Sequence, residues 1–285
     1  MPAACGLAEH DWPPMPESHR IRLRHVVSCV PRHDELVGLL AGGSFVAGRL
    51  DRYSDLDLIV VTAPHAWPGI LERRTALAAE WGPLLGAFRG DHVGEPRLLI
   101  CLYGPPLVHV DLKFLTPDQL GCRVEDPVVL WARDASVASG LAAGRASYPR
   151  PDLQWIEDRF WIWVHYAATK IGRGELFEAL GCGAFVRSRV LGPLALDIAG
   201  ARPDGVRRLE QTGTADADAM RQTVAAYDAR DIARAVSASV GLYRSLRDRI
   251  ADATLERHPE AEAAAVAYLE DVARTLGHDP EEPVA

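Results

Sequence analysis

A pair of aspartates has the residue type and spacing that suit metal chemistry. Asp55 and Asp57 flank a single leucine at the start of an apolar run, and Asp111 lies in a second apolar segment. Side chains alternate between the two faces of a strand, so Asp55 and Asp57 point to the same side. Two carboxylates this close repel each other unless a cation lies between them. Because Mg2+ prefers carboxylate oxygens and usually brings substrate phosphates, the pair predicts a Mg-nucleotide site.

A Gly-Ser pair precedes the aspartates by a spacer of ten residues. Gly43 has no Cβ, so the backbone can approach phosphates closely. Ser44 begins a predicted short helix, where a hydroxyl and free backbone N–H groups suit a phosphate. Arg49 and Arg52 lie in the spacer and can neutralise phosphate charge. Each motif alone also has a structural interpretation, because Gly-Gly-Ser and Asp-x-Asp are common in turns and Asp111 can pair with Lys113.

The combination of Gly43, Ser44, the spacer, Asp55 and Asp57 resembles the signature of the nucleotidyltransferase superfamily that includes DNA polymerase beta and the antibiotic nucleotidyltransferases. The resemblance covers roughly residues 35–115 well. It implies that Asp55, Asp57 and Asp111 hold two Mg2+ ions, which clamp the attacking and leaving oxygens of an in-line displacement. It also implies an α+β fold, in which a mixed-sheet nucleotidyltransferase domain precedes a C-terminal helical bundle domain.

Further site residues are implied by the same resemblance in the second half of the chain. A Lys or Arg of the helix after the linker commonly reaches the triphosphate in that family, which indicates Lys170 and Arg173. Glu157 or Asp158 can serve as the general base for an acceptor hydroxyl, with Asp111 as the rival. Acidic residues near a helix N-terminus are favoured by the helix dipole in any case, so both also have a structural interpretation.

The elements that position these residues follow from hydrophobic periodicity. The first half predicts helices at 17–29, 44–50 and 69–81, strands at 37–42, 55–62 and 127–131, and a hairpin of 97–103 with 107–115. The second half predicts helices at 152–172, 174–199, 216–253 and 259–276, with a linker over 138–151. The domains are then a loose extension over residues 1–16, a catalytic domain over 17–150 and a helical domain over 151–285.

Composition narrows the partners. The net charge is −8, and residues 152–285 carry 16 Lys and Arg against 22 Asp and Glu. This balance argues against nucleic acid as a partner, since such proteins need a basic groove, and it suits a small acceptor, a cationic one included. The odd number of cysteines and their spacing indicate free thiols in a cytoplasmic protein. The sequence predicts neither a signal peptide nor a membrane span, and it leaves the oligomeric state open.

Three functions compete. The first is an enzyme that transfers AMP from ATP to a hydroxyl of a small molecule and releases pyrophosphate, with aminoglycosides or lincosamides as the best acceptor class by resemblance. The second is a protein-adenylylating or toxin–antitoxin nucleotidyltransferase; the spacing of Arg159 and His165 resembles a motif of RNA-cleaving toxins. The third is a binding protein that keeps the fold without the chemistry, which the intact aspartates argue against.

Overall fold

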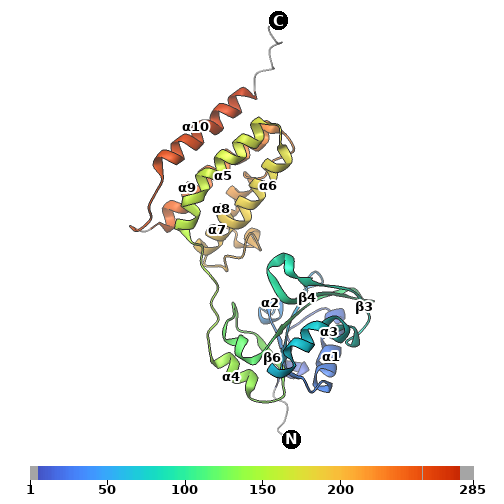
Figure 1. The fold of residues 1–285 in the computed structure, drawn as a ribbon. Helices are drawn as coiled ribbons and strands as arrows, with labels where there is room; N and C mark the ends of the chain where they lie inside the picture. Colours follow the sequence, from blue (N-terminus) through green and yellow to red (C-terminus); the bar gives the residue numbers. More distant parts are fainter. Residues whose placement is uncertain (1–5, 252, 277–285) are drawn as a thin grey trace. The chain divides into compact units, whose positions relative to one another are not determined.

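The computed structural model describes residues 6–251 and 253–276. The chain divides into two compact units, Met1–Tyr148 and Pro149–Ala285. The first unit combines a mixed sheet with helices and the second is helical (Figure 1). The predicted α+β class is therefore confirmed.

Six strands form one sheet in the described part of the first unit, in the order β3-β4-β5-β2-β1-β6. Strands β2 and β5 pair in parallel, and every other neighbouring pair is antiparallel. The strands are β1 (Leu36–Ala41), β2 (Leu56–Thr62), β3 (Leu84–Gly90), β4 (Glu95–Tyr103), β5 (Val108–Leu115) and β6 (Val128–Ala132). All of them except β3 were predicted within a few residues.

Helices cover one face of this sheet fully and the other face only in part. Helices α1 (Glu17–Cys29) and α3 (Trp67–Glu80) pack their apolar residues against β4, β5 and β2 and form the main core. Helix α4 (Ser136–Ala142) covers the opposite face near β1 through Val137, and it overlaps the start of the segment predicted as a linker, 138–151. The rest of that second face, over β2, β5, β4 and β3, carries half-buried and exposed side chains.

Residues 6–16 are more ordered than a loose extension. Trp12 is only 6% exposed and belongs to the main core, and the Leu7 N–H donates to the Val129 carbonyl of β6 at 2.9 Å. Glu9 forms a bidentate pair with Arg24 of α1. The burial of Trp12 therefore contradicts the prediction of a loose extension for residues 6–16. Residues 1–5 lie outside the described part.

The second unit is built from six helices in its described residues: α5 (Leu153–Gly172), α6 (Leu176–Val186), α7 (Gly192–Ile198), α8 (Ala215–Arg221), α9 (Ala229–Ile250) and α10 (Pro259–Thr275). A π-helical turn over Arg187–Leu191 joins α6 to α7, so the helix predicted at 174–199 runs nearly through. The helix predicted at 216–253 is broken instead. Asp228 accepts from the Asp231 N–H at 2.8 Å and starts α9 as a new helix.

The stretch Leu176–Ile198 is long and apolar enough to cross a membrane by length and composition, although the sequence predicted no such stretch. Its Val186, Val190, Leu191 and Leu194 belong to the core of the second unit. A core helix of a soluble protein passes the same test, so the finding is weak evidence for a membrane span.

Candidate active site

Two adjacent parallel strands bring the three predicted aspartates together. Asp57 of β2 lies directly beside Asp111 of β5 in the strand register, and Asp55 comes just before β2. One carboxylate oxygen from each of the three lies within 4.8 Å of the others, and all three residues are half-buried. We call Asp55, Asp57 and Asp111 the aspartate triad.

The triad fits a hard divalent cation. Three carboxylates held this close repel one another, and a cation relieves this repulsion while using oxygen ligands that Mg2+ prefers. His109, two residues before Asp111 on the same face of β5, places its Nε2 2.9 Å from Asp111 Oδ1. An imidazole in contact with a carboxylate is a usual means of orienting a metal ligand.

The Gly-Ser turn lies against the triad. The Gly42 N–H donates to the Asp57 carbonyl at 2.9 Å, which fixes the turn to β2. Gly43 has φ +55°, and a Cβ there would lie 1.9 Å from Asp57 Oδ2. Glycine is therefore required twice, by the left-handed backbone and by the carboxylate. Ser44 follows in the short helix α2 (Gly43–Val46), which packs on β2.

The spacer between Ser44 and Asp55 is closed by a side-chain turn. Asp51 Oδ1 accepts from the Tyr53 N–H at 2.8 Å and from the Ser54 hydroxyl at 3.0 Å. The His19 ring nitrogen lies 2.7 Å from the Ser54 carbonyl and ties the spacer to α1. The turn chemistry considered for this segment is thus present and sets where Asp55 enters the sheet.

The two arginines of the spacer lie on the surface. Arg49 is exposed at the end of the spacer's helical part. Arg52 is also exposed, donates to the Tyr53 hydroxyl and lies over the Tyr53 ring at 4.5 Å. Their role toward phosphate stays a prediction.

Sequence reasoning missed one carboxylate. Glu125, from the loop before β6, accepts from the Gly43 N–H through Oε1 at 2.6 Å. Arg123 anchors this loop by donating to the carbonyls of Leu120 and Leu141 at 3.2 and 2.9 Å. A glutamate 82 residues away in the sequence gives no local signal, because only the folded sheet places β6 near the Gly-Ser turn.

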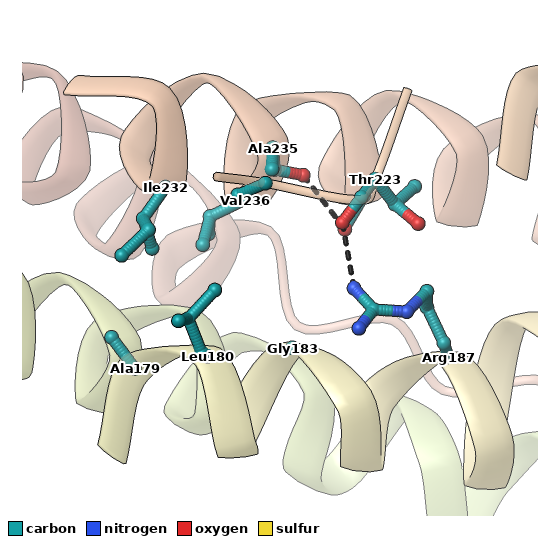
Figure 2. A pocket seen from close by; sticks show the side chains of 10 residues that line it. Ala179, Leu180, Gly183, Arg187, Thr223, Ile232, Ala235 and Val236 are labelled. Atoms are coloured by element: carbon teal, nitrogen blue, oxygen red, sulfur yellow. Dashed lines mark hydrogen bonds between the residues drawn. The ribbon is translucent and has the colours of Figure 1, made fainter. Parts of the chain in front are cut away.

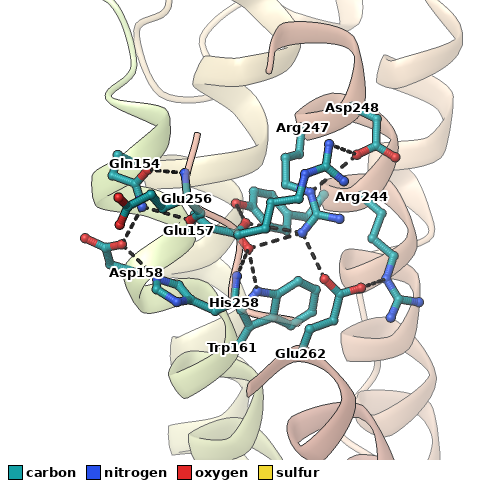
Figure 3. Close-up of polar contacts among 12 residues, drawn as sticks. Gln154, Glu157, Asp158, Trp161, Arg244, Arg247, Asp248, Glu256, His258 and Glu262 are labelled. Atoms are coloured by element: carbon teal, nitrogen blue, oxygen red, sulfur yellow. Dashed lines mark hydrogen bonds and ion pairs between the residues drawn. The ribbon is translucent and has the colours of Figure 1, made fainter. Parts of the chain in front are cut away.

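Glu157, a predicted base, lies inside the second unit (Figure 3). It is 0% exposed. Its carboxylate accepts from the Tyr243 hydroxyl at 2.6 Å and from Trp161 Nε1 at 3.1 Å, and Arg247 Nη1 lies 3.2 Å away. Burial raises the pKa of this carboxyl, but the hydrogen bonds outweigh it and hold the pKa below its usual range. An acceptor hydroxyl cannot reach a fully buried carboxylate. This burial contradicts the prediction that Glu157 serves as a general base.

Asp158, the neighbouring candidate, is accessible but engaged. Its side chain is 44% exposed and lies 3.0 Å from the His258 ring nitrogen, while Gln154 donates to it at 2.7 Å. The hydrogen bonds from His258 and Gln154 lower the pKa of Asp158. A lowered pKa makes a weaker base, and its role stays a prediction.

Lys170 and Arg173 also lie in the second unit, at the end of α5. Both pair with Glu175, Lys170 closely and Arg173 at 3.8 Å, and Lys170 lies 5.2 Å from the centre of the Tyr166 ring. The hydrogen bond with Glu175 raises the pKa of Lys170. The structure groups these cations with each other, and their contact with a triphosphate stays a prediction.

The toxin-like spacing of Arg159 and His165 does not produce a pair. Arg159 lies over the Trp155 ring at 4.6 Å, while the His165 ring packs on Tyr268 of α10 at 4.6 Å. Each side chain therefore engages a different neighbour.

A cavity opens between α6 and α9 in the second unit (Figure 2). Leu180, Ile232 and Val236 form its apolar walls, and Arg187 donates to the Thr223 carbonyl at 2.7 Å at its edge. Its volume of about 10 Å³ suits a single water molecule. This space is too small for a nucleotide or a drug.

Comparisons with known proteins give little beyond this geometry. No family model matches the chain, and no curated protein matches it. Among solved structures, an aminoglycoside 6-adenyltransferase from Bacillus subtilis matches with a TM-score of 0.40 and 11% identity, covering 88% of this chain and 97% of that one. A likeness this distant does not decide the function.

Proposed function

We propose that the protein is a Mg2+-dependent nucleotidyltransferase that moves AMP from ATP to a hydroxyl of a small molecule and releases pyrophosphate. The observation that carries the proposal is the aspartate triad, with its oxygens within 4.8 Å of one another, beside the Gly43 turn. Asp55, Asp57 and Asp111 would hold the metal, which when bound neutralises phosphate charge and polarises the reacting oxygens.

The residues of the chain then act by positioning. The turn at Gly43 and Ser44 offers backbone N–H groups and a hydroxyl to the phosphates. The acceptor oxygen forms a bond to the α-phosphorus while the bond from that phosphorus to the pyrophosphate oxygen breaks. The hydroxyl proton leaves to a carboxylate of the site, for which Asp111 is the accessible candidate. A cytoplasmic location is part of the proposal, and Cys29, Cys101, Cys122 and Cys182 are free thiols in keeping with it.

The test is pyrophosphate release from ATP and Mg2+ with a panel of aminoglycosides and lincosamides, with the Asp57→Asn variant as the blank. Release that needs both a drug and Asp57 is the expected result. Release that persists in Asp57→Asn would reject the metal assignment. The absence of release with every drug of the panel would move the acceptor from antibiotics to a protein or another metabolite.

A further inference from the structure

One row of side chains crosses four strands on the open face of the sheet. In the strand registers Asp57 pairs with Asp111, Asp111 with Ile100, and Ile100 with Phe88. Cross-strand partners share a face, so these four side chains stand in line from β2 through β5 and β4 to β3. The row begins with two carboxylates of the triad and continues with apolar side chains.

The part of the face beyond the triad is apolar and accessible. Phe88 is 56% and Leu102 40% exposed, while Leu98 and Ile100 are half-buried. Leu98 and Leu102 flank Ile100 on the same face of β4, because residues two apart in a strand point the same way. We call Phe88, Leu98, Ile100 and Leu102 the apolar row. Contiguous exposed apolar side chains of this kind mark ligand-binding or interaction sites in soluble proteins.

A charged cluster beside the apolar row pairs one carboxylate with two cations. Glu95 accepts from Arg97 Nε at 2.7 Å and pairs with Lys113 Nζ at 2.7 Å. Burial raises the pKa of Glu95, but these two cations outweigh it and lower the pKa to about 2. The carboxylate is therefore ionised and neutralised at neutral pH. This cluster offers no unpaired negative charge to a polycation.

The geometry of the proposed reaction places the acceptor on the side of the apolar row. The Gly43 turn and α2 pack on β2, so the phosphates and the leaving pyrophosphate belong on that side of the triad. In an in-line displacement the attacking hydroxyl comes from the side opposite the leaving group. That opposite side is β5 followed by β4 and β3, where Ile100 and Phe88 lie.

We infer that the acceptor is an amphipathic hydroxyl compound with an apolar face next to its reacting hydroxyl, as in lincosamides, which lies on the apolar row. Polycationic aminoglycosides lack such a face. The inference rests on the proposed function and names its acceptor class. Burial of the acceptor's apolar face supplies the binding energy, and the row fixes the hydroxyl at the triad.

The test is calorimetric titration of the full-length protein. Lincomycin and kanamycin are each titrated into protein that already holds Mg2+ and a non-hydrolysable ATP analogue. We expect lincomycin to bind more tightly than kanamycin, and Ile100→Thr and Phe88→Ser each to weaken lincomycin about tenfold. Threonine keeps the β-branch at Ile100 and so the strand. Ile21→Thr is the matched control, since Ile21 is an exposed residue of α1, which packs on the other face.

The nucleotide titration separates the two hypotheses. The ATP analogue should bind Ile100→Thr, Phe88→Ser and Ile21→Thr as tightly as wild type. Its affinity should fall when Asp57 is replaced. Tighter binding of kanamycin, no binding of either drug, or unchanged lincomycin affinity in both row variants would overturn the acceptor class. A nucleotide affinity that stays the same when Asp57 is replaced would instead reject the proposed function itself.

Discussion

Gly43 is the residue at which backbone conformation and site chemistry meet. A Cβ at this position would lie 1.9 Å from Asp57 Oδ2, and the φ of +55° disfavours any other residue. We therefore predict that Gly43→Ala displaces Asp57 and weakens Mg-ATP binding about tenfold, equivalent to about 1.4 kcal/mol. Isothermal titration measures this affinity.

Gly48 provides the control for the backbone term alone. It has φ +62°, but a Cβ there would meet nothing within 4 Å. Gly48→Ala should lower the free energy of unfolding by about 1 kcal/mol and leave the Mg-ATP affinity as in wild type. Equal loss of affinity in both variants would show that backbone strain, and not contact with Asp57, explains the requirement for Gly43.

Glu125 holds the backbone N–H that the proposed phosphate would take. Its Oε1 accepts from the Gly43 N–H at 2.6 Å, so a triphosphate must displace a like-charged group. We predict that Glu125→Gln, which keeps the acceptor oxygen and removes the charge, tightens Mg-ATP binding about fivefold at low salt, since two charges about 4 Å apart in water interact by about 1 kcal/mol.

The salt dependence of that binding checks the cause. An electrostatic gain should shrink as ionic strength rises toward 1 M, where the Debye length is about 3 Å. Weaker Mg-ATP binding in Glu125→Gln at every salt concentration would mean that the Glu125 charge serves the metal or the turn instead.

At the scale of elements, a buried ionic cluster joins α5, α9 and α10 (Figure 3). Arg247 Nη1 lies 3.2 Å from Glu157 and 2.9 Å from Glu262, and its side chain is only 5% exposed. We predict that Arg247→Met lowers the free energy of unfolding of the second unit by about 3–5 kcal/mol, because it leaves the Glu157 charge buried without its partner. Denaturant unfolding measures the loss.

An exposed ion pair provides the matched control for Arg247→Met, and the pKa of Glu157 sets the pH dependence of the cluster. Arg221 pairs with Asp218 with both side chains over 70% exposed, so Arg221→Met should cost under about 1 kcal/mol. Because the pKa of Glu157 is lowered in the folded state, its contribution is present at neutral pH and is lost as pH falls through that lowered pKa. An Arg247→Met loss no larger than that of Arg221→Met would contradict the structural role.

The strands also show which parts of the fold could be predicted from the sequence. Strands β1, β2, β4 and β5 alternate or run apolar, and turn residues bound them, so pattern alone predicted them. Strand β3 was missed because Leu84–Gly90 has two glycines and little alternation, and it is held by pairing with β4. The aspartate triad was predictable because two of its members share one local motif, whereas Glu125 reaches the site only through the sheet.

At the scale of the whole molecule, the two units have separate hydrophobic cores. One cluster of buried residues lies entirely in the second unit, and two others lie in the first. Separate cores favour two calorimetric transitions, since multidomain chains commonly depart from two-state unfolding. A ligand of the triad should then affect only the transition of the first unit.

Asp57→Asn tests this division and the electrostatic strain of the triad together. Without metal, removing one of three carboxylates within 4.8 Å relieves repulsion, so the first unit of the variant should melt at a higher temperature than in wild type. Saturating Mg2+ should raise the wild-type transition by several degrees, since a ligand at a hundred times its Kd stabilises by about 2.7 kcal/mol. The variant should show little of that rise, and the second unit's transition should stay fixed in both proteins. A Mg2+ shift of equal size in wild type and variant would place the ion away from Asp57, and a shift of both transitions would mean that the two cores do not unfold independently.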